Sequence, residues 1–291
     1  MKGPQLAIIG GTGVYDLRLL QDVEALDIAT PYGPPSDRIY VGALHGLRIA
    51  FLARHGRGHR LLPHEIPYRA NIWALKSLGV SQVVSISACG SMKEQYAPGD
   101  IVIPDQLFDR THGRPATFFG DGFVAHVSFS EPFCKDLSQL LCQCVRAAGG
   151  KVHVGGTYLI IQGPRFSTRG ESFTYRQWGM DIIGMTALPE AQLAREAEMC
   201  YSVMAHVTDY DCWHETEEAV SVELVTKTLE RNGELARRAV VELAMAQAQR
   251  TTSRRCACRD ALQGALLTPA HLIPDGTRER LAPIIGRYLQ G

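Results

Sequence analysis

The feature of this chain best suited to chemistry is a pair of aspartates, Asp209 and Asp211. The apolar run at residues 202–207 predicts a buried strand, so the pair lies where that strand passes into a loop. Side chains two positions apart in an extended chain point the same way, and neighbouring carboxylates repel, which raises the pKa of at least one. A carboxyl group that keeps its proton near neutral pH can donate it to a leaving group. The pair is therefore a candidate for general acid catalysis, with a solvated turn as the alternative.

A candidate anion site lies in residues 53–60, where three arginines and two histidines follow another apolar stretch. Arginine binds phosphate through paired hydrogen bonds, and histidine adds a further donor. The glycine turn at residues 10–13, which contains Thr12, can direct backbone N–H groups toward an anion. It lacks the third glycine of a dinucleotide-binding turn because Asp16 stands in that place. A nucleotide-binding or redox module is therefore only a weak alternative to an enzyme that binds phosphate.

Eight cysteines are distributed along the chain, and most are expected to be buried thiols. Cys256 and Cys258 differ because they lie in the polar stretch 250–260. The sequence around them contains no second pair of metal ligands, so we expect no metal site. A disulfide between Cys256 and Cys258 is the alternative, and whether Cys134 and Cys200 are bridged is equally open.

The composition is that of an ordinary globular protein of 291 residues, with 45% hydrophobic and 21% charged residues. Lysine plus arginine equals aspartate plus glutamate, at 30 each, which gives no sign of a nucleic-acid partner. No apolar run reaches the roughly 18 residues of a membrane span, and the start of the sequence does not resemble a secretory signal. We therefore expect a cytoplasmic enzyme that binds small molecules.

Strand-like and helix-like segments alternate, which is typical of an α/β fold. Short apolar runs predict strands at residues 6–9, 38–43, 47–53, 82–88, 101–103, 157–162, 181–184 and 202–207. Apolar residues at helical spacing predict helices at residues 67–78, 133–148, 189–198 and 221–249, with two short helices at 259–267 and 277–288. The polar motifs follow strands, where α/β sheets bind their ligands.

Together these motifs resemble the trimeric purine nucleoside phosphorylase family, and within it the 5′-methylthioadenosine phosphorylase branch. The shared strings, in the family's order, are IIGGTG (8–13), ARHGRGH (53–59), ANIWALK (70–76), SACGS (87–91), PGDIVIPDQLFDRT (98–111), QGPRFSTRGES (162–172), GMTALPE (184–190) and TDYDCW (208–213). The resemblance implies an α/β three-layer fold, with a mixed, twisted central sheet flanked by helices. It covers roughly residues 6–249 and implies one phosphorylase domain, 1–249. A C-terminal linker and short helices, 250–291, would pack on that domain or on a neighbouring subunit.

The resemblance implies phosphorolysis, in which orthophosphate, a co-substrate, displaces a purine from C1′ of a nucleoside without a metal or an organic cofactor. The expected substrate is 5′-methylthioadenosine and the products are adenine and 5-methylthioribose 1-phosphate, a step of purine and methionine salvage. A broader purine nucleoside phosphorylase acting on adenosine, inosine or methylthioinosine is the alternative. The family also implies a homotrimer, with a hexamer of paired trimers as the alternative, because a site borrows a residue from a neighbour.

Roles are carried over by motif. Asp209, with Asp211 beside it, would protonate the purine at N7 and accept a hydrogen bond from the 6-amino group of adenine. The phosphate would be held by Thr12, Arg54, His55, Ser87, Ala88 and Thr208. The ribose would contact Met185 and Thr186, and the base or methylthio pocket would be formed by Phe166, Val222 and Val225, with His126 from a neighbouring subunit. Ser87 departs from the threonine often found there, but either hydroxyl can donate.

Overall fold

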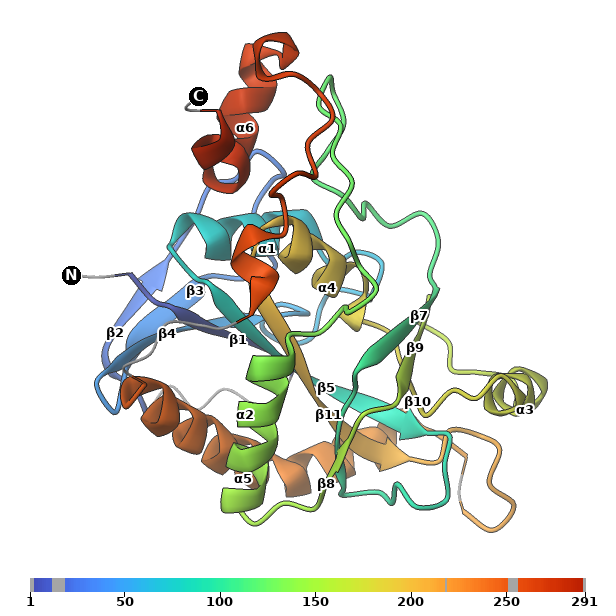
Figure 1. Ribbon diagram of the computed structural model, residues 1–291. Helices are drawn as coiled ribbons and strands as arrows, with labels where there is room; N and C mark the ends of the chain where they lie inside the picture. The colour runs from blue at the N-terminus through green and yellow to red at the C-terminus, as the bar shows by residue number, and fades with distance from the viewer. Residues whose placement is uncertain (1–2, 12–18, 218, 251–255, 290–291) are drawn as a thin grey trace.

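The computed structural model describes residues 3–11, 19–217, 219–250 and 256–289, and it has helices on both faces of a single mixed sheet (Figure 1). The strands are β1 (Leu6–Gly10), β2 (Gln21–Leu26), β3 (Ile39–Leu44), β4 (Leu47–Ala53), β5 (Gln82–Ser91), β6 (Ile101–Ile103), β7 (Gln106–Arg110), β8 (Val152–Val154), β9 (Thr157–Ile161), β10 (Ile182–Gly184) and β11 (Cys200–Asp209). The helices are α1 (Tyr68–Ser77), α2 (Lys135–Ala147), α3 (Arg169–Gln177), α4 (Ala187–Glu196), α5 (Val222–Ala248) and α6 (Asp275–Ile285), with short 3₁₀ turns η2 (Ala257–Asp260), η3 (Ala270–Leu272) and η4 (Gly286–Tyr288).

The centre of the sheet is parallel, and this is what gathers the polar motifs at one edge. Strands β4, β1, β5 and β11 lie side by side and run in the same direction. Their register pairs Gly10 with Ala53 and Asp209 with Gly90. Strands β5 and β11 each have ten residues, and the last two residues of β5, Gly90 and Ser91, also pair with the antiparallel strand β10. The carboxyl ends of four strands therefore meet around β5.

Each central strand is buried on both faces, and successive side chains enter different cores. Ala7 and Ile9 of β1 belong to one core, whereas Leu6 and Ile8 belong to the other. This alternation is the two-fold period of a strand, and burial on both faces explains why these segments are nearly continuous apolar runs.

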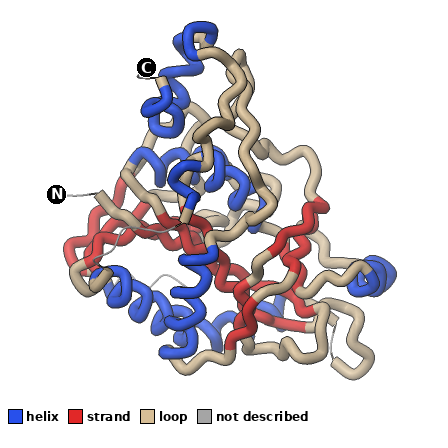
Figure 2. The backbone as a smooth tube through the Cα atoms, in the orientation of Figure 1, coloured by secondary structure: helices blue, strands red, loops and turns tan. Residues whose placement is uncertain are grey.

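Helices α1 and α4 cover one face of the sheet, and α2 and α5 cover the other (Figures 1 and 2). Leu137, Leu141 and Val145 line the inner side of α2, at the i, i+4, i+8 spacing that predicted this helix. A third, smaller core that contains Tyr175 and Trp213 lies beneath α3. None of the helices in the described residues is both long and apolar enough to cross a membrane.

The C-terminal segment, defined here as residues 256–289, packs on the rest of the chain. The indole Nε1 of Trp73 donates to the carbonyl of Arg280 at 2.8 Å, which holds α6 against α1. Leu266 forms a β-bridge with Ala125. Leu262, Leu281 and Ile285 are fully buried in the same core as α1 and α4. This segment therefore supplies part of the core.

Some sequence-based predictions of elements are corrected. The helix expected at 259–267 is only the turn η2 followed by irregular chain, because Gly264 has a left-handed backbone (φ +74°) and the residues after it pair with the loop around Ala125. Strands β2, β7 and β8 and helix α3 were not predicted. Strand β2 is exposed along most of its length, and α3 buries only Ser172 and Tyr175, so neither shows an apolar period.

Candidate active site

Asp209 is the last residue of β11 and is 2% exposed. Its Oδ2 accepts a hydrogen bond from the hydroxyl of Thr208 at 2.6 Å, and its Oδ1 accepts one from the backbone N–H of Asp211 at 2.8 Å. A cavity of about 570 Å³ adjoins it, between the end of β11 and the first turns of α5, and is lined in part by Tyr210 and Leu224. The carboxyl group is therefore oriented by its own loop and borders a space large enough for a small ligand.

Burial raises the pKa of Asp209 to about 6, and the neighbouring charge of Asp211 adds to the rise. The hydrogen bonds from Thr208 and from Asp211 act in the opposite direction. The sequence predicted the raised pKa but assigned it to repulsion within the pair. The structure corrects the cause, because removal from water outweighs the second carboxylate.

Asp211 approaches Asp209 by a route that the sequence did not predict. An extended backbone would turn both side chains the same way, but Asp211 has a left-handed backbone (φ +53°) and lies beyond the end of the strand. Its N–H bonds back to Asp209, which is the turn that aspartate favours. Burial raises the pKa of Asp211 as well, opposed by the hydroxyl groups of Ser172 and Ser167.

Two further motifs pack around this loop. Gly90 leaves room for it, because a Cβ at that position would lie 2.9 Å from Oδ1 of Asp209 and 3.0 Å from Ile183. The indole of Trp213 donates to the carbonyl of Ser91 at 2.7 Å, and the guanidinium of Arg176 lies 3.3 Å from the centre of its ring. Strand β5, the TDYDCW motif and α3 thus meet at one place. The positions of the motifs after strands predicted that the first two would meet, whereas α3 was not predicted.

Arg54 is engaged in a buried ion pair. Its guanidinium donates to both carboxylate oxygens of Glu190, at 3.0 and 3.1 Å, and also to the hydroxyl of Ser85 at 2.6 Å. Arg54 is 1% exposed and Glu190 is fully buried. In this structure Arg54 thus connects α4, through Glu190, to the central strands. The predicted contact of Arg54 with phosphate stays a prediction.

The other predicted phosphate ligands lie at the same edge of the sheet. The backbone N–H of Arg54 bonds to the carbonyl of Gly10 at 3.0 Å, so His55, which comes two residues after the end of β4, lies near the end of β1. His55 bonds through Nδ1 to the carbonyl of Leu61 at 2.8 Å and stacks on His59 at 4.1 Å. Burial lowers the pKa of His55 to about 4, so the ring is neutral at pH 7.

Ser87 and Ala88 are half-buried in β5, where both contact the phenol of Tyr158. The Ser87 hydroxyl lies 3.2 Å from the Tyr158 oxygen. Thr208, paired with Asp209, completes the set, whereas Thr12 lies outside the described residues.

Met185 and Thr186 form the connection between β10 and α4. The backbone carbonyl of Met185 accepts a hydrogen bond from Arg114 at 2.7 Å, and Thr186 is buried at the start of the helix. Arg114 also bonds to the carbonyls of Leu188 and Gln162, at 2.7 Å each. It therefore ties the predicted ribose segment to the loop that carries Phe166.

The remaining pocket residues are spread over three places. Phe166 is half-buried, near the loop of Asp211. Val225 is half-buried in the first turns of α5, and Val222 is 71% exposed. His126 is exposed and lines a separate cavity of about 390 Å³ together with Phe119 and Glu196, so within this chain it does not join Asp209. That position agrees with the expectation that it serves a neighbouring subunit, which stays a prediction.

Four residues of the site escaped the sequence analysis as individuals: Gly90, Arg114, Tyr158 and Glu190. Gly90 and Glu190 lie inside recognised motifs, and a glycine beside a strand end could have indicated close packing. Arg114 and Tyr158 carry no local signal, because each acts through partners far away in the chain.

Comparison with known proteins places these motifs in context. A family model described as the phosphorylase superfamily matches residues 5–244. The S-methyl-5′-thioadenosine phosphorylase of Gloeobacter violaceus is 50% identical over 99% of this chain and 98% of its own length. That of Chloroflexus aurantiacus is 51% identical over 99% of both chains.

Solved structures agree with these relatives. A crystal structure of a methylthioadenosine phosphorylase from an Antarctic soil metagenomic library superposes with a TM-score of 0.92 at 46% identity, covering 98% of this chain and 99% of that one. A mutant adenosine/methylthioadenosine phosphorylase of Schistosoma mansoni, in complex with methylthioadenosine, superposes with a TM-score of 0.83 at 36% identity, covering 90% and 96%. These superpositions confirm the predicted α/β three-layer fold.

Proposed function

Because the chain belongs to the phosphorylase superfamily, we propose that it is a pentosyltransferase that catalyses the phosphorolysis of 5′-methylthioadenosine. Orthophosphate attacks C1′ of the ribose, the bond from C1′ to N9 of the purine breaks, and the products are adenine and 5-methylthioribose 1-phosphate. The observation that carries this proposal is Asp209, a buried carboxyl group at a strand end with a pKa of about 6.

Asp209 acts as the general acid. Negative charge develops on the purine as the bond breaks, and a proton delivered to N7 neutralises it. The same side chain selects the base, because a carboxyl group accepts a hydrogen bond from a 6-amino group. A 6-oxo group would instead place its lone pairs against those of the carboxyl oxygen. That would leave both polar groups unpaired in a buried site, which is strongly disfavoured.

The phosphate lies on the other side of the sugar, at the ends of the parallel strands. Its ligands are the turn with Thr12, the side chains of His55, Ser87 and Thr208, and the backbone at Ala88. Arg54 provides positive charge beneath them, shared with Glu190. A dianion held in a site from which water is excluded stabilises the positive charge that develops at C1′. Orthophosphate is a co-substrate, and the reaction uses no cofactor.

The sugar and its methylthio group bind between the connection from β10 to α4, the loop of Phe166 and the first turns of α5. Met185 and Thr186 contact the ribose, and Phe166 faces the base. Val222 and Val225 form an apolar wall for the methylthio group, and His126 comes from a neighbouring subunit of a homotrimer, which can pair into a hexamer. The enzyme acts in the cytoplasm, in purine and methionine salvage.

The first test is a reaction of the purified protein with 5′-methylthioadenosine, with and without orthophosphate. We expect adenine to form only with phosphate, in equal amount with the sugar phosphate. Release of adenine at the same rate without phosphate would indicate hydrolysis and contradict the proposal.

The second test is Asp209→Asn. Loss of the acid is expected to lower kcat/KM for 5′-methylthioadenosine by about 10²–10⁴-fold and to improve methylthioinosine relative to it. Asp27→Asn, at an exposed surface pair, is the control and should keep full activity. An unchanged preference between the two bases would show that Asp209 does not contact the purine.

A broader specificity is the second candidate. The exposure of Val222 favours it, because a valine open to solvent adds little to the selection of an apolar group over a 5′-hydroxyl. Values of kcat/KM for adenosine, inosine and their methylthio analogues decide between the two. A preference for 5′-methylthioadenosine of less than about tenfold over adenosine would favour the broader enzyme.

A further inference from the structure

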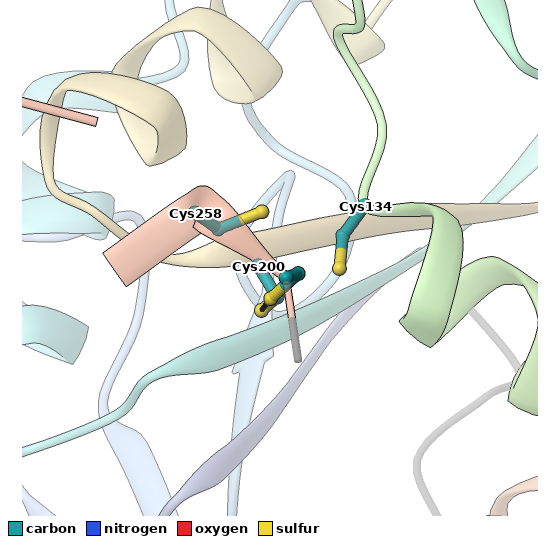
Figure 3. Close-up of side chains that lie close together, drawn as sticks. Cys134, Cys200 and Cys258 are labelled. Carbon is teal, nitrogen blue, oxygen red and sulfur yellow. Dashed lines mark hydrogen bonds between the residues drawn. The ribbon is translucent and has the colours of Figure 1, made fainter. Parts of the chain in front are cut away.

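Four cysteines converge at the amino end of β11, away from the candidate active site. The sulfur atoms of Cys134, Cys200, Cys256 and Cys258 all lie within 4.8 Å of one another. Figure 3 shows the side chains of Cys134, Cys200 and Cys258 close together, brought there by different elements. The sequence analysis found no second pair of ligands beside Cys256 and Cys258. The fold supplies that pair from the residue before α2 and from the first residue of β11.

We propose that these four cysteines bind one structural Zn²⁺ ion as a tetrathiolate, which fastens the C-terminal segment to the central sheet. Four thiolates are the ligand set of closed structural zinc sites. Each thiol gives up its proton when the metal binds, so that four sulfur charges surround the ion.

The distances between the four sulfur atoms fit the binding of one shared ion. Zinc–sulfur bonds of about 2.3 Å in a tetrahedron place the sulfur atoms about 3.8 Å apart. The sulfur atoms of Cys200 and Cys256 lie 3.3 Å apart, and the whole set stays within 4.8 Å. A disulfide would bring one pair to about 2.05 Å. So compact a set encloses a single ion and leaves no space for a cluster of several metals.

The surroundings favour thiolates. Cys134 stands just before the first turn of α2, where the positive end of the helix dipole stabilises negative charge. The guanidinium of Arg195 lies 3.9 Å from the sulfur of Cys258. Hydrogen bonds and positive charge of this kind hold the ligands of a metal in place.

The backbone also presents the ligands. The N–H of Cys134 bonds to the carbonyl of Tyr201 at 2.8 Å, which fixes the first two ligand segments together. Cys256 is extended, and Cys258 lies in the turn η2 that follows. One intervening residue is shorter than the usual spacing of two to four in zinc sites. The change from extended chain to tight turn nevertheless brings both sulfur atoms into the cluster.

The position assigns a structural role to the metal. Cys200 and Asp209 are the first and last of the ten residues of β11, roughly 30 Å apart, and four protein ligands leave no open coordination position for a substrate. The zinc instead holds the start of the C-terminal segment. Further along, this segment binds the loop of His126, whose N–H bonds to the carbonyl of Ala265 at 2.9 Å.

The proposal stands independently of the reaction and is tested without an activity assay. The full chain is purified under reducing conditions without chelators, and zinc and iron are measured per chain. We expect about one zinc and no iron. Replacement by Co²⁺ should give the intense visible absorption of tetrahedral thiolate coordination.

Variants locate the site. Cys134→Ser and Cys256→Ser should each lose most of the zinc, and proteolysis should then remove the C-terminal segment several-fold faster. Cys142→Ser, at a buried cysteine in the helix that Cys134 precedes, is the matched control and should keep the metal. Cys256 is only half-buried, so its variant is expected to fold even if that of Cys134 does not.

Several results would overturn the proposal. One is failure of the reduced wild-type protein to take up zinc during a titration. Another is iron in place of zinc, and a third is full retention of zinc in the Cys256 variant. A fourth is alkylation and mass spectrometry of the protein as isolated, without reduction, that finds these four cysteines joined in disulfides.

Discussion

Strand β11 carries reactive groups at both ends, and the two ends are built in opposite ways. At its carboxyl end, Asp209 is oriented by Thr208 and Asp211, within two residues of it, and borders a cavity. At its amino end, Cys200 meets sulfur atoms from segments 56 or more residues away, and the set closes on itself.

A proton donor and a structural centre place different requirements on the chain around them. A proton donor must keep one side free for its substrate, so its loop is shaped locally. A structural centre must join distant segments, so its ligands come from several parts of the chain. Changes at the carboxyl end should therefore alter activity and pH dependence, whereas changes at the amino end should alter the docking of the C-terminal segment.

The largest effect expected on stability comes from the ion pair that lies between the two ends. Glu190→Gln leaves the guanidinium of Arg54 buried without its charge partner, although Tyr201 and Ser85 remain close by. The free energy of unfolding should fall by about 3–5 kcal/mol. Urea unfolding measures this, with Glu234→Gln at an exposed pair as a control that should change it by no more than ~1 kcal/mol. Equal effects of the two substitutions would contradict the role given to burial.

The second effect depends on pH and belongs to the carboxyl end alone. The pKa of Asp209 is about 6 in the folded chain, against an ordinary aspartate value of 3.8 in the unfolded chain. Folding therefore favours the protonated form, so this contribution is complete below pH 3.8 and is lost as pH rises through about 6. The loss should be on the order of 2–3 kcal/mol and should be absent in Asp209→Asn.

Activity should follow the same group. A general acid works while it is protonated, so kcat/KM should decline as pH rises above about 6. A profile in which wild type and Asp209→Asn share the same descending limb would remove Asp209 from the role of acid.

A smaller effect tests the packing that shapes the acid. Gly90→Ala places a methyl group 2.9 Å from Oδ1 of Asp209 and should destabilise the fold by about 1–3 kcal/mol while lowering activity. Gly170→Ala is the matched control, because a methyl group there meets nothing within 4 Å. Thermal unfolding and kcat together give the readout. Full activity in Gly90→Ala would mean that the loop tolerates displacement.

The smallest expected effect lies at the other end. The hydroxyl of Tyr288 donates to Glu198 at 2.6 Å, beside the bond from Leu262 N–H to the same carboxylate. Tyr288→Phe should cost about 1 kcal/mol and speed proteolysis of the C-terminal segment, while kcat stays the same. A fall in kcat as large as that of Gly90→Ala would show that the two ends are coupled.

The sequence predicted the parts of the fold that have a local pattern. Strands β1, β4 and β11 are continuous apolar runs because both faces are buried, and α5 shows a long helical period. The hairpin of β3 and β4 was predicted by the turn at His45 and Gly46, both of which have a positive φ. Exposed or short elements such as β2 and β8 carry no such pattern.

In the site too, the sequence predicted what has a local pattern and missed contacts between distant parts of the chain. Motifs predicted that the loops of Asp209, Gly90 and Ser172 would meet, and they do. The partner of Arg54 is 136 residues away, and the thiols extend from residue 134 to residue 258, so no local pattern could indicate either. Only the three-dimensional arrangement of the sheet brings them together.

The burial of Leu262, Leu281 and Ile285 has a practical consequence for anyone who shortens this protein. The family model ends at residue 244, which invites truncation shortly after α5. Such a fragment would expose apolar side chains of the core to which these three residues belong, and exposed apolar patches promote aggregation. For recombinant expression, the end of the family model is therefore a poor guide to where the folding unit ends.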